Sequence, residues 1–301
     1  MDSPMGFQAK VDHVMHSTPL GRVAYQASRR ILHLGRKIVH PTIPTNLGVI
    51  KVVCRGKHIS ILHRRNYSDK LAIDQCFQQE QYDMPDREHG VLAECFYRQI
   101  LAAGKKPLIL DCGANIGASV LWFAARYPEA HVLAVEPAPD NFALLQMNCS
   151  GLDVDLRHAG IGSTDGLTHL IDIGWGTLAY RTASSDNGFE VSMLTVETLL
   201  SQKPASHYVP FLLKIDIEGS EKSLFDGDCS AISQFPLIIL EPHDWLLPGE
   251  GTSLPFFRFH AAAGREFCMK NENIASMNFH CNPPAAATNL TATQSEVEAL
   301  P

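Results

Sequence analysis

The sequence predicts an α/β fold in which an open, mostly parallel β-sheet carries helices on both faces, preceded by an N-terminal hairpin and helices. Two observations predict this fold. Short apolar runs alternate with helix-like patterns from residue 105 onward, which is typical of βαβ units. The run at 107–110 ends at Asp111 and a glycine-containing turn, which opens a helix through Ser119 and Leu121. A turn of this kind at the end of a parallel strand is a common nucleotide-binding site.

The turn after Asp111 departs from the pattern of dinucleotide-binding proteins. Gly113 and Gly117 let the backbone bend and approach a ligand closely. Asn115 stands where a dinucleotide fold has its middle glycine, and asparagine is one of the few residues with a side chain that tolerates a left-handed backbone. This departure counts against NAD as the ligand.

Two acidic residues follow adjacent strands of the predicted sheet. Asp111 closes the first strand, where a carboxylate would repel a pyrophosphate and attract an ammonium group. The next strand, 131–135, ends in Glu136, which can accept hydrogen bonds from both hydroxyls of a ribose. S-adenosylmethionine carries a ribose and an ammonium group but no phosphate, so it matches both positions.

Composition limits the class of protein. The 301 residues, 45% hydrophobic and 19% charged, fit one principal domain with extensions. A net charge of −7 gives no general attraction to nucleic acid. The eight cysteines show neither zinc-site nor disulfide spacing, which indicates reduced thiols. We find neither a membrane-spanning segment nor a secretory signal, and we expect a cytoplasmic protein.

Residues 18–40 have apolar side chains at helical spacing and a basic opposite face. Such a helix either contacts a membrane surface or an acidic partner, or packs on the domain with a solvated cationic face. We favour the second interpretation, because solvated cationic faces are common.

The residues before the main sheet are expected to form a cover. Strands at 47–53 and 58–62 are predicted to pair as a hairpin across a short glycine-containing connection. A helix capped by residues 67–69 follows, and a second helix is predicted at 91–101. We expect both helices to cover the cofactor site.

These patterns divide the chain into three parts. Residues 1–104 are expected to hold the N-terminal helices and hairpin, and residues 105–281 the S-adenosylmethionine-binding catalytic domain. Residues 282–301 are rich in Ala, Thr, Pro and Asn without apolar periodicity, so we expect a mobile tail.

The second half of the chain continues the sheet. Apolar runs at 154–158, 211–216 and 237–240 are predicted as further core strands. Residues 163–194 instead alternate apolar and polar side chains, which predicts an antiparallel insertion that could wall a substrate pocket. Because the carboxyl ends of parallel strands meet at one edge, the polar residues that follow them should face one site.

Four motifs stand out along the chain. They are Leu-Asp-Cys-Gly-Ala-Asn-Ile-Gly at 110–117, Val-Glu-Pro at 135–137, Met-Leu-Thr-Val-Glu-Thr-Leu-Leu at 193–200 and Leu-Lys-Ile-Asp-Ile-Glu-Gly-Ser-Glu at 213–221. With weaker matches from about residue 66 to 280, they resemble the FkbM family of S-adenosylmethionine-dependent methyltransferases. Glu197 departs from the aspartate usual there. The resemblance implies a class I methyltransferase fold, a Rossmann-like seven-stranded sheet in the order 3-2-1-4-5-7-6.

The resemblance also implies a set of cofactor contacts. Asp111, Gly113, Ala114, Asn115 and Gly117 would hold the methionine part, Glu136 the ribose, and Pro137, Phe142 and the turn at Ala159 and Gly160 the adenine, with Asp216 as a further contact. Characterised members mainly methylate hydroxyl groups on sugars and natural products. We therefore expect O-methylation of a small hydroxylated acceptor, as in natural-product biosynthesis.

Methyl transfer to a hydroxyl also needs a group that removes the hydroxyl proton. His243 has a suitable intrinsic pKa, and Asp216 and Glu218 could orient it or act themselves. Lys214 could be a base with a lowered pKa, although a structural ion pair with a neighbouring acid is the favoured interpretation.

Two alternatives stay open at this point. Asp216, Glu218, Glu241, His243 and Asp244 offer ligands for a divalent metal such as Mg²⁺, although a site without metal is favoured. The chain could also be a non-catalytic protein that binds a nucleotide or nucleotide sugar on the same fold.

Overall fold

The computed structural model describes residues 46–172, 180–183 and 189–279, and its centre is a seven-stranded β-sheet. The strands of this central sheet are β3 (Lys106–Cys112), β4 (His131–Glu136), β5 (Val154–His158), β10 (Tyr208–Ile215), β11 (Leu237–Leu240), β12 (Glu266–Lys270) and β13 (Asn273–Met277). They lie in the order β12-β13-β11-β10-β3-β4-β5. The five strands from β11 to β5 are parallel, whereas β13 is antiparallel to β11 and to β12. Numbered along the chain, this is the predicted order 3-2-1-4-5-7-6, so the fold class is confirmed.

Strand β3 is apolar because it is buried on both faces. Leu108 and Leu110 pack into the core on one side of the sheet, and Ile109 packs into the core on the other side. A strand with helices on both faces has no side that needs polar residues. Its polar residue, Asp111, comes at the carboxyl end, where the site is built.

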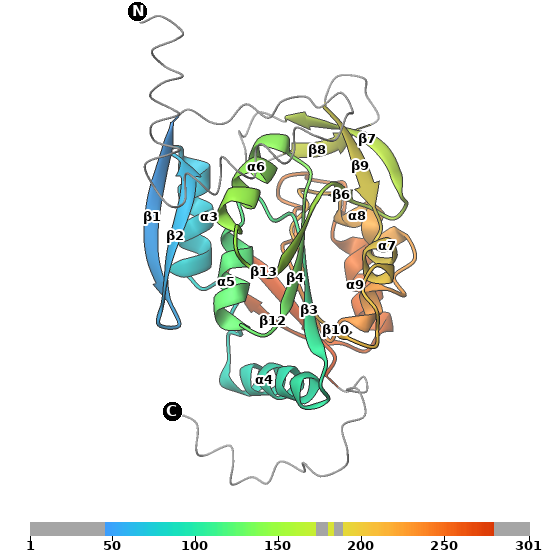
Figure 1. The fold of residues 1–301 in the computed structure, drawn as a ribbon. Coiled ribbons are helices and arrows are strands. Elements are labelled where there is room, and N and C mark those ends of the chain that lie inside the picture. Colours follow the sequence, from blue (N-terminus) through green and yellow to red (C-terminus); the bar gives the residue numbers. More distant parts are fainter. Residues whose placement is uncertain (1–45, 173–179, 184–188, 280–301) are drawn as a thin grey trace, which may run out of the picture.

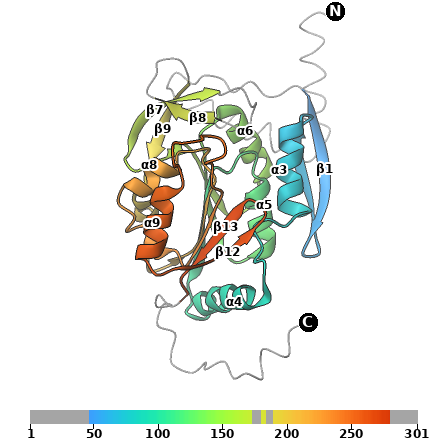
Figure 2. The same ribbon diagram turned by 180° about the vertical axis from the view of Figure 1, so that it is seen from behind.

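Helices cover both faces of the central sheet (Figures 1 and 2). One face carries α4 (Arg87–Ala102), α5 (Ala118–Arg126) and α6 (Pro139–Asn148). The opposite face carries α7 (Val196–Ser201), α8 (Glu221–Asp226) and α9 (Leu254–Ala262). Because α5 and α6 follow β3 and β4 directly, their first turns lie at the carboxyl edge of the sheet.

The predicted N-terminal hairpin is confirmed. Strands β1 (Leu47–Cys54) and β2 (Lys57–Arg64) pair antiparallel, and α3 (Tyr67–Phe77) lies between them and α5 in Figure 1. Helix α3 is capped by Asn66 and not by residues 67–69, because the Asn66 side chain accepts a hydrogen bond of 2.9 Å from the Asp69 amide. Hairpin, helix and central sheet contribute to one hydrophobic core.

Helix α4 corrects one prediction. It begins at Arg87, four residues before the predicted start at 91, because Asp86 caps it. Phe96 of this helix stacks on Phe211 of β10 with ring centroids 6.5 Å apart. The helix packs along the end of the sheet that is lowest in Figure 1, and its residues line neither of the cavities described below. The expectation that both helices cover the site is therefore wrong for α4.

The predicted antiparallel insertion is also confirmed. It forms a four-stranded sheet of β6 (Gly160–Ile161), β7 (Gly166–Asp172), β8 (Tyr180–Ala183) and β9 (Phe189–Leu194). Strand β7 pairs antiparallel with β8 and β9, while β6 pairs parallel with β9. Figure 1 shows this sheet beside the first turn of α6.

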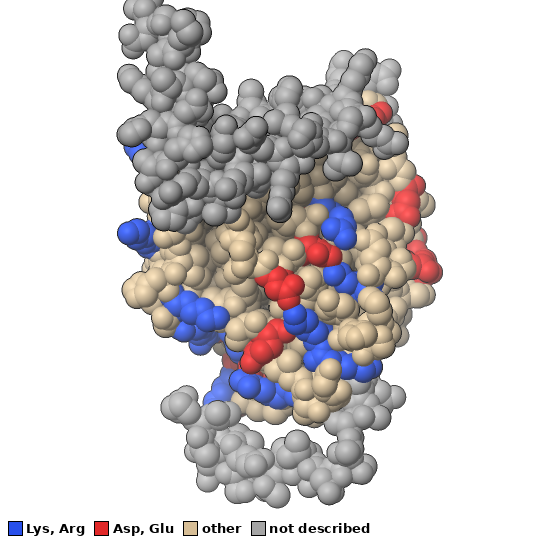
Figure 3. All heavy atoms as spheres, in the orientation of Figure 1, with Lys and Arg blue, Asp and Glu red and all other residues tan. Residues whose placement is uncertain are grey.

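Two predicted segments, the helix at 18–40 and the tail at 282–301, lie outside the described residues. Within the described part of the chain, no helix has the length and apolarity to cross a membrane. On the face in Figure 3, basic and acidic side chains are interspersed. Lys106, the first residue of β3, pairs with Asp153, which directly precedes β5.

Candidate active site

Two neighbouring cavities open at the carboxyl edge of the central sheet. The smaller cavity is lined by residues that follow β3, β4 and β5, including Glu136, Pro137, Ala159 and Gly160. The larger one, of about 800 Å³, lies between α3 and the residues that follow β10 and β11. Gly113, Asn115, Asp216 and Glu218 line both cavities. A ligand that passes from one cavity to the other would therefore contact these four residues.

The turn after β3 has the backbone that the sequence predicts. Gly113, Asn115 and Gly117 all have positive φ angles, of 85°, 50° and 90°. A Cβ atom at Gly113 would lie 1.9 Å from the carbonyl oxygen of Asp216, so this position admits only glycine. The backbone N–H of Asn115 donates to Glu136 Oε2 at 2.8 Å. Asn115 Oδ1 is buried and has no hydrogen-bond partner among the described residues.

We expect Asn115→Gly to bind S-adenosylhomocysteine with a free energy within ~1 kcal/mol of wild type, because glycine adopts the same backbone and keeps the N–H that donates to Glu136. Isothermal titration calorimetry measures this directly. A large loss of affinity would instead identify the Asn115 amide as a ligand of the cofactor.

Glu136 lies at the end of β4 and is 4% exposed. Its Oε1 accepts hydrogen bonds from the Ala138 N–H at 2.9 Å and from Asn141 Nδ2 at 3.2 Å. Burial raises the pKa of Glu136 to about 7, against the lowering effect of these hydrogen bonds. The side chain is thus held by three donors, counting the Asn115 N–H, on the wall of the smaller cavity.

Not every predicted cofactor contact lines a cavity. Ala114 lines the larger cavity, whereas Gly117 and Phe142 line neither. Phe142 stacks on His158 with ring centroids 4.9 Å apart. Gly117 packs against α6, where an added Cβ would lie 2.9 Å from a methyl group of Leu145. Both residues therefore shape the site from behind its surface.

Asp111 also differs from its expected position. It is fully buried, accepts a hydrogen bond of 2.5 Å from Ser119 Oγ, and lies 3.2 Å from Lys214 Nζ. It lines neither cavity. Asp216 lies 3.3 Å from the same Lys214 nitrogen, but its side chain is 26% exposed and it lines both cavities. Of the two aspartates in contact with Lys214, Asp216 is thus the one that a ligand in the cavities can reach.

Lys214 has a structural environment. Its Nζ donates to the Gly113 carbonyl oxygen at 2.6 Å and contacts both aspartates. Burial lowers the pKa of Lys214, but the charge of Asp111 and its other anionic neighbours outweigh burial and raise it well above the usual value. These surroundings favour a structural ion pair for Lys214 over a base with a lowered pKa.

His243 follows β11 and is surrounded by acids. Its side chain is 1% exposed, and its Nδ1 lies 2.9 Å from Glu221 Oε1. Its Nε2 lies 3.5 Å from Glu218, 3.7 Å from Asp216 and 3.8 Å from Glu241. We call His243 and these four carboxylates the acidic cluster.

The acidic cluster corrects the expectation that the intrinsic pKa of His243 suits it to act as a base. Burial lowers the pKa of His243, but the hydrogen bond and charge of Glu221 and the charge of Asp216 outweigh burial and raise it to about 10. At neutral pH the ring is protonated, and an imidazolium has no free lone pair to accept a proton.

Glu218 and Glu241 have pKa values suited to proton transfer. Burial, reinforced by the charge of Asp216, raises the pKa of each to about 8, while the His243 charge opposes the rise. Glu218 also has a φ of 55°, which is strained for a residue with a long side chain. It lines both cavities, whereas Glu241 lines only the larger one.

The proposed metal ligands are only partly together. Ligand atoms of Asp216, Glu241 and His243 lie within 4.8 Å of one another. Asp244 is turned away and accepts hydrogen bonds from Ser253. The favoured prediction of a site without metal stays a prediction.

Comparison with known proteins identifies the family of this chain. A family model described as the methyltransferase FkbM domain matches residues 111–261. The chain belongs to the FkbM methyltransferase family. The chemistry of this family is methyl transfer from S-adenosylmethionine, and the match covers the turn after β3, Glu136 and the acidic cluster. Arg64 of β2 and the whole of α3, which includes Asp69, precede the matched region.

Two curated relatives resemble this FkbM family member in sequence. Methyltransferase 1 of Beauveria bassiana is 29% identical over 144 residues, which cover 40% of this chain and 57% of the relative. The hexuronic acid methyltransferase AglP of Haloferax volcanii is 24% identical over 155 residues, covering 50% of this chain and 62% of the relative. The chain thus spans about three fifths of the length of these relatives. A solved methyltransferase from Geobacter sulfurreducens matches 71% of this chain and 89% of its own, at 12% identity and a TM-score of 0.30.

Proposed function

We propose that this protein is an S-adenosylmethionine-dependent O-methyltransferase that acts on a hydroxyl group of a sugar or natural-product acceptor. The observation that carries the proposal is the position of Glu218, a carboxylate on the wall shared by the two cavities. Membership of the FkbM family supports the methyl donor, and the larger cavity has the size typical of a small-molecule site.

The cofactor would occupy the smaller cavity and the turn after β3. Glu136 would accept hydrogen bonds from the ribose, Pro137, Ala159 and Gly160 would border the adenine, and Asp216 would pair with the ammonium group. When bound, S-adenosylmethionine supplies a methyl group on a positively charged sulfur. The chain's own task is then to align a hydroxyl oxygen with that methyl, exclude water and take up the hydroxyl proton.

Glu218 is the residue that we propose as the general base. A carboxylate with a pKa of about 8 is a stronger base than an ordinary glutamate and is still largely ionised above pH 8. The proton leaves the acceptor oxygen for a Glu218 oxygen. The His243 imidazolium, 3.5 Å away and held by Glu221, would position Glu218 and limit the rise of its pKa.

The lining of the larger cavity supports a sugar-like acceptor. Planar polar side chains line it, namely Gln75, Gln79, Asn271 and Glu272. Two exposed aromatic residues join them, Tyr67 at 75% exposure and Trp245 at 60%. Planar hydrogen-bonding groups suit the hydroxyls of a sugar, and an aromatic face suits its apolar C–H surface. The relative AglP is described as a hexuronic acid methyltransferase, which is compatible with this class.

The function is tested by incubating the protein with methyl-labelled S-adenosylmethionine and a panel of glycosides, glucuronides and polyhydroxylated compounds. We expect labelled methyl ethers that resist alkali, and we expect turnover to persist in EDTA. Label in amines or in alkali-labile esters would contradict O-methylation. Activity that EDTA abolishes and Mg²⁺ restores would identify a metal site at Asp216, Glu241 and His243. Binding of UDP-sugars, NAD or ATP without binding of S-adenosylmethionine would favour the non-catalytic alternative.

A further inference from the structure

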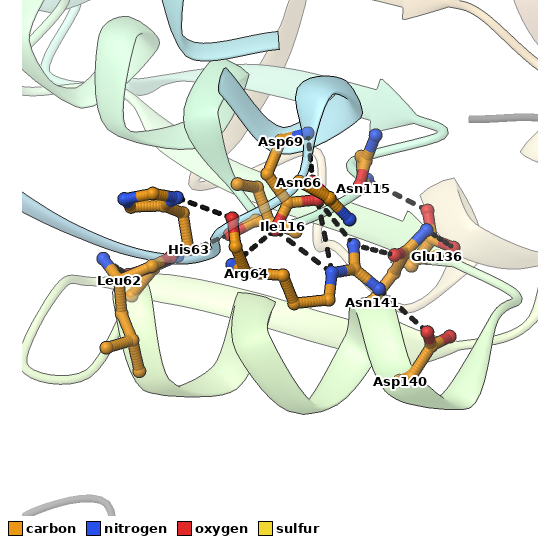
Figure 4. A network of polar contacts seen from close by, with 11 residues as sticks. Leu62, His63, Arg64, Asn66, Asp69, Asn115, Ile116, Glu136, Asp140 and Asn141 are labelled. Carbon is orange, nitrogen blue, oxygen red and sulfur yellow. Dashed lines mark hydrogen bonds and ion pairs between the residues drawn. The ribbon is translucent and has the colours of Figure 1, made fainter. Parts of the chain in front are cut away.

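A buried polar network joins the N-terminal hairpin to Glu136 (Figure 4). Arg64, the last residue of β2, donates four hydrogen bonds to the Asp69 carboxylate, at 2.7 to 3.1 Å. Two come from its Nε, one from its Nη2 and one from its backbone N–H. Its Nη2 also donates to Asn141 Oδ1 at 2.6 Å, and its Nη1 donates to Asp140 Oδ2 at 2.7 Å. Asn141 Nδ2 in turn donates to Glu136 Oε1 at 3.2 Å.

Apart from Asp140, whose side chain is 28% exposed, the network is nearly sealed from water. Arg64 is 8% exposed, Asp69 1%, Asn141 3% and Glu136 4%. Buried charges of this kind are costly unless each has partners, so replacing one member leaves the others unsatisfied. The contacts are therefore a constraint on geometry as well as a contribution to stability.

The direction of the hydrogen bonds carries the argument. A guanidinium has donors only, so the atom of Asn141 that faces Arg64 must be its amide oxygen. The Asn141 amide nitrogen must then point the other way, toward Glu136, whose carboxylate oxygen accepts its hydrogen bond. Arg64 thus fixes which way the Asn141 amide points, and Asn141 in turn donates a hydrogen bond that holds the Glu136 carboxylate in place.

The same arginine bonds to two helix turns that border the two cavities. Asp69 lies in the first turn of α3, whose residues Tyr67 and Ser68 line the larger cavity. Asn141 lies in the first turn of α6 and lines the smaller one. Arg64 lies between these two turns and bonds to both.

We infer that Arg64 is a positioning residue for cofactor binding, which acts through Asn141 on Glu136. The inference rests on the proposed role of Glu136 at the ribose, and it extends the cofactor site to a segment that precedes the matched family region. Arg64 and Asp69 would not touch the cofactor themselves, because neither lines a cavity.

The test compares Arg64→Lys with Arg55→Lys by calorimetric titration with S-adenosylhomocysteine. Lysine keeps the charge but cannot bond to Asp69 and Asn141 together, so we expect Arg64→Lys to weaken binding about tenfold. Arg55 is the matched control because it lies in the turn of the same hairpin and pairs with Asp83 at 2.6 Å. This ion pair does not contact Glu136. Arg55→Lys should bind like wild type. Equal affinity of the two variants would overturn the inference.

A second variant keeps the inference testable if Arg64→Lys folds poorly. Asn141→Asp preserves an acceptor for Arg64 but replaces the donor to Glu136 by a second carboxylate. We expect the folded variant to lose affinity at least as strongly as Arg64→Lys. Unchanged affinity would show that the Asn141 amide does not act on Glu136.

A double-mutant cycle with Glu136→Ala separates positioning from a general structural role. If Arg64 acts through Glu136, adding Arg64→Lys to Glu136→Ala should cost little further affinity. Fully additive losses would contradict the proposed path. Failure of the wild type to bind S-adenosylhomocysteine would instead contradict the proposed function, so the two failures are distinguishable.

Discussion

Glu218→Gln should lower kcat by ~10²–10⁴ while the Kd for S-adenosylhomocysteine stays near the wild-type value. The amide is close in size to the carboxylate but cannot accept the hydroxyl proton. Because Glu218 lines both cavities, it can reach an acceptor oxygen next to the transferred methyl. Single-turnover kinetics with a saturating acceptor would measure the chemical step separately from binding.

The pH dependence of kcat provides a second test of Glu218 as the base. Burial raises the pKa of Glu218 to about 8, and a base works only when deprotonated, so wild-type kcat should rise as pH increases through about 8. This rising limb should disappear in Glu218→Gln. Glu241→Gln is the matched control, since Glu241 has a similarly raised pKa but lines only the larger cavity. If Glu241→Gln loses kcat and Glu218→Gln keeps it, the base has been misassigned.

The core strands and the βα turns could be predicted from sequence because their signals are local. The run at 107–110 is apolar throughout, and the glycines and Asn115 at the turn each have a backbone reason for their identity. Helix boundaries were less accurate, because Asn66 and Asp86 cap their helices through side-chain bonds that apolar periodicity does not register. The helix α4 was predicted in sequence but its place against β10 depends on distant contacts.

The site residues could be gathered from sequence, but their ionisation could not. Asp111 lies at the end of β3, while Lys214 and Asp216 lie at the end of β10. Only the pairing of these strands shows that Lys214 contacts both aspartates, with Asp111 buried and Asp216 facing the cavities. His243 owes its raised pKa to Glu221, a residue 22 positions away on α8. The sequence motif at 213–221 contains Glu221 but does not indicate that it faces a histidine.

Arg64 illustrates the same limit. It ends an exposed-looking hairpin strand in which histidines, lysine and arginine are frequent, so composition favours a solvated side chain. Its burial depends on Asp69 and Asn141, which lie 5 and 77 positions away. A buried arginine with several acceptors can be recognised only after α3 and α6 are placed together.

Glu136→Ala is expected to raise the Kd for S-adenosylhomocysteine by ~10- to 150-fold, since charge-assisted hydrogen bonds worth ~1.5–3 kcal/mol are lost and the ribose hydroxyls are left unpaired. The Asn115 and Ala138 N–H groups would lose their acceptor as well. Calorimetric titration measures the change without needing the acceptor.

The charge on Glu136 can be tested in the same titration. Burial raises the pKa of Glu136 to about 7, so its ionised form, the better acceptor for the ribose, is populated only as pH rises through about 7. Wild-type affinity should therefore increase across this range, and Glu136→Ala should show no such increase. Glu272→Ala, on the wall of the larger cavity, should bind like wild type. A wild-type Kd retained by Glu136→Ala would mean that the ribose lies elsewhere, because among the described residues no second acid lines the smaller cavity on the β4 side, where Asn141 and Pro137 are its neighbours.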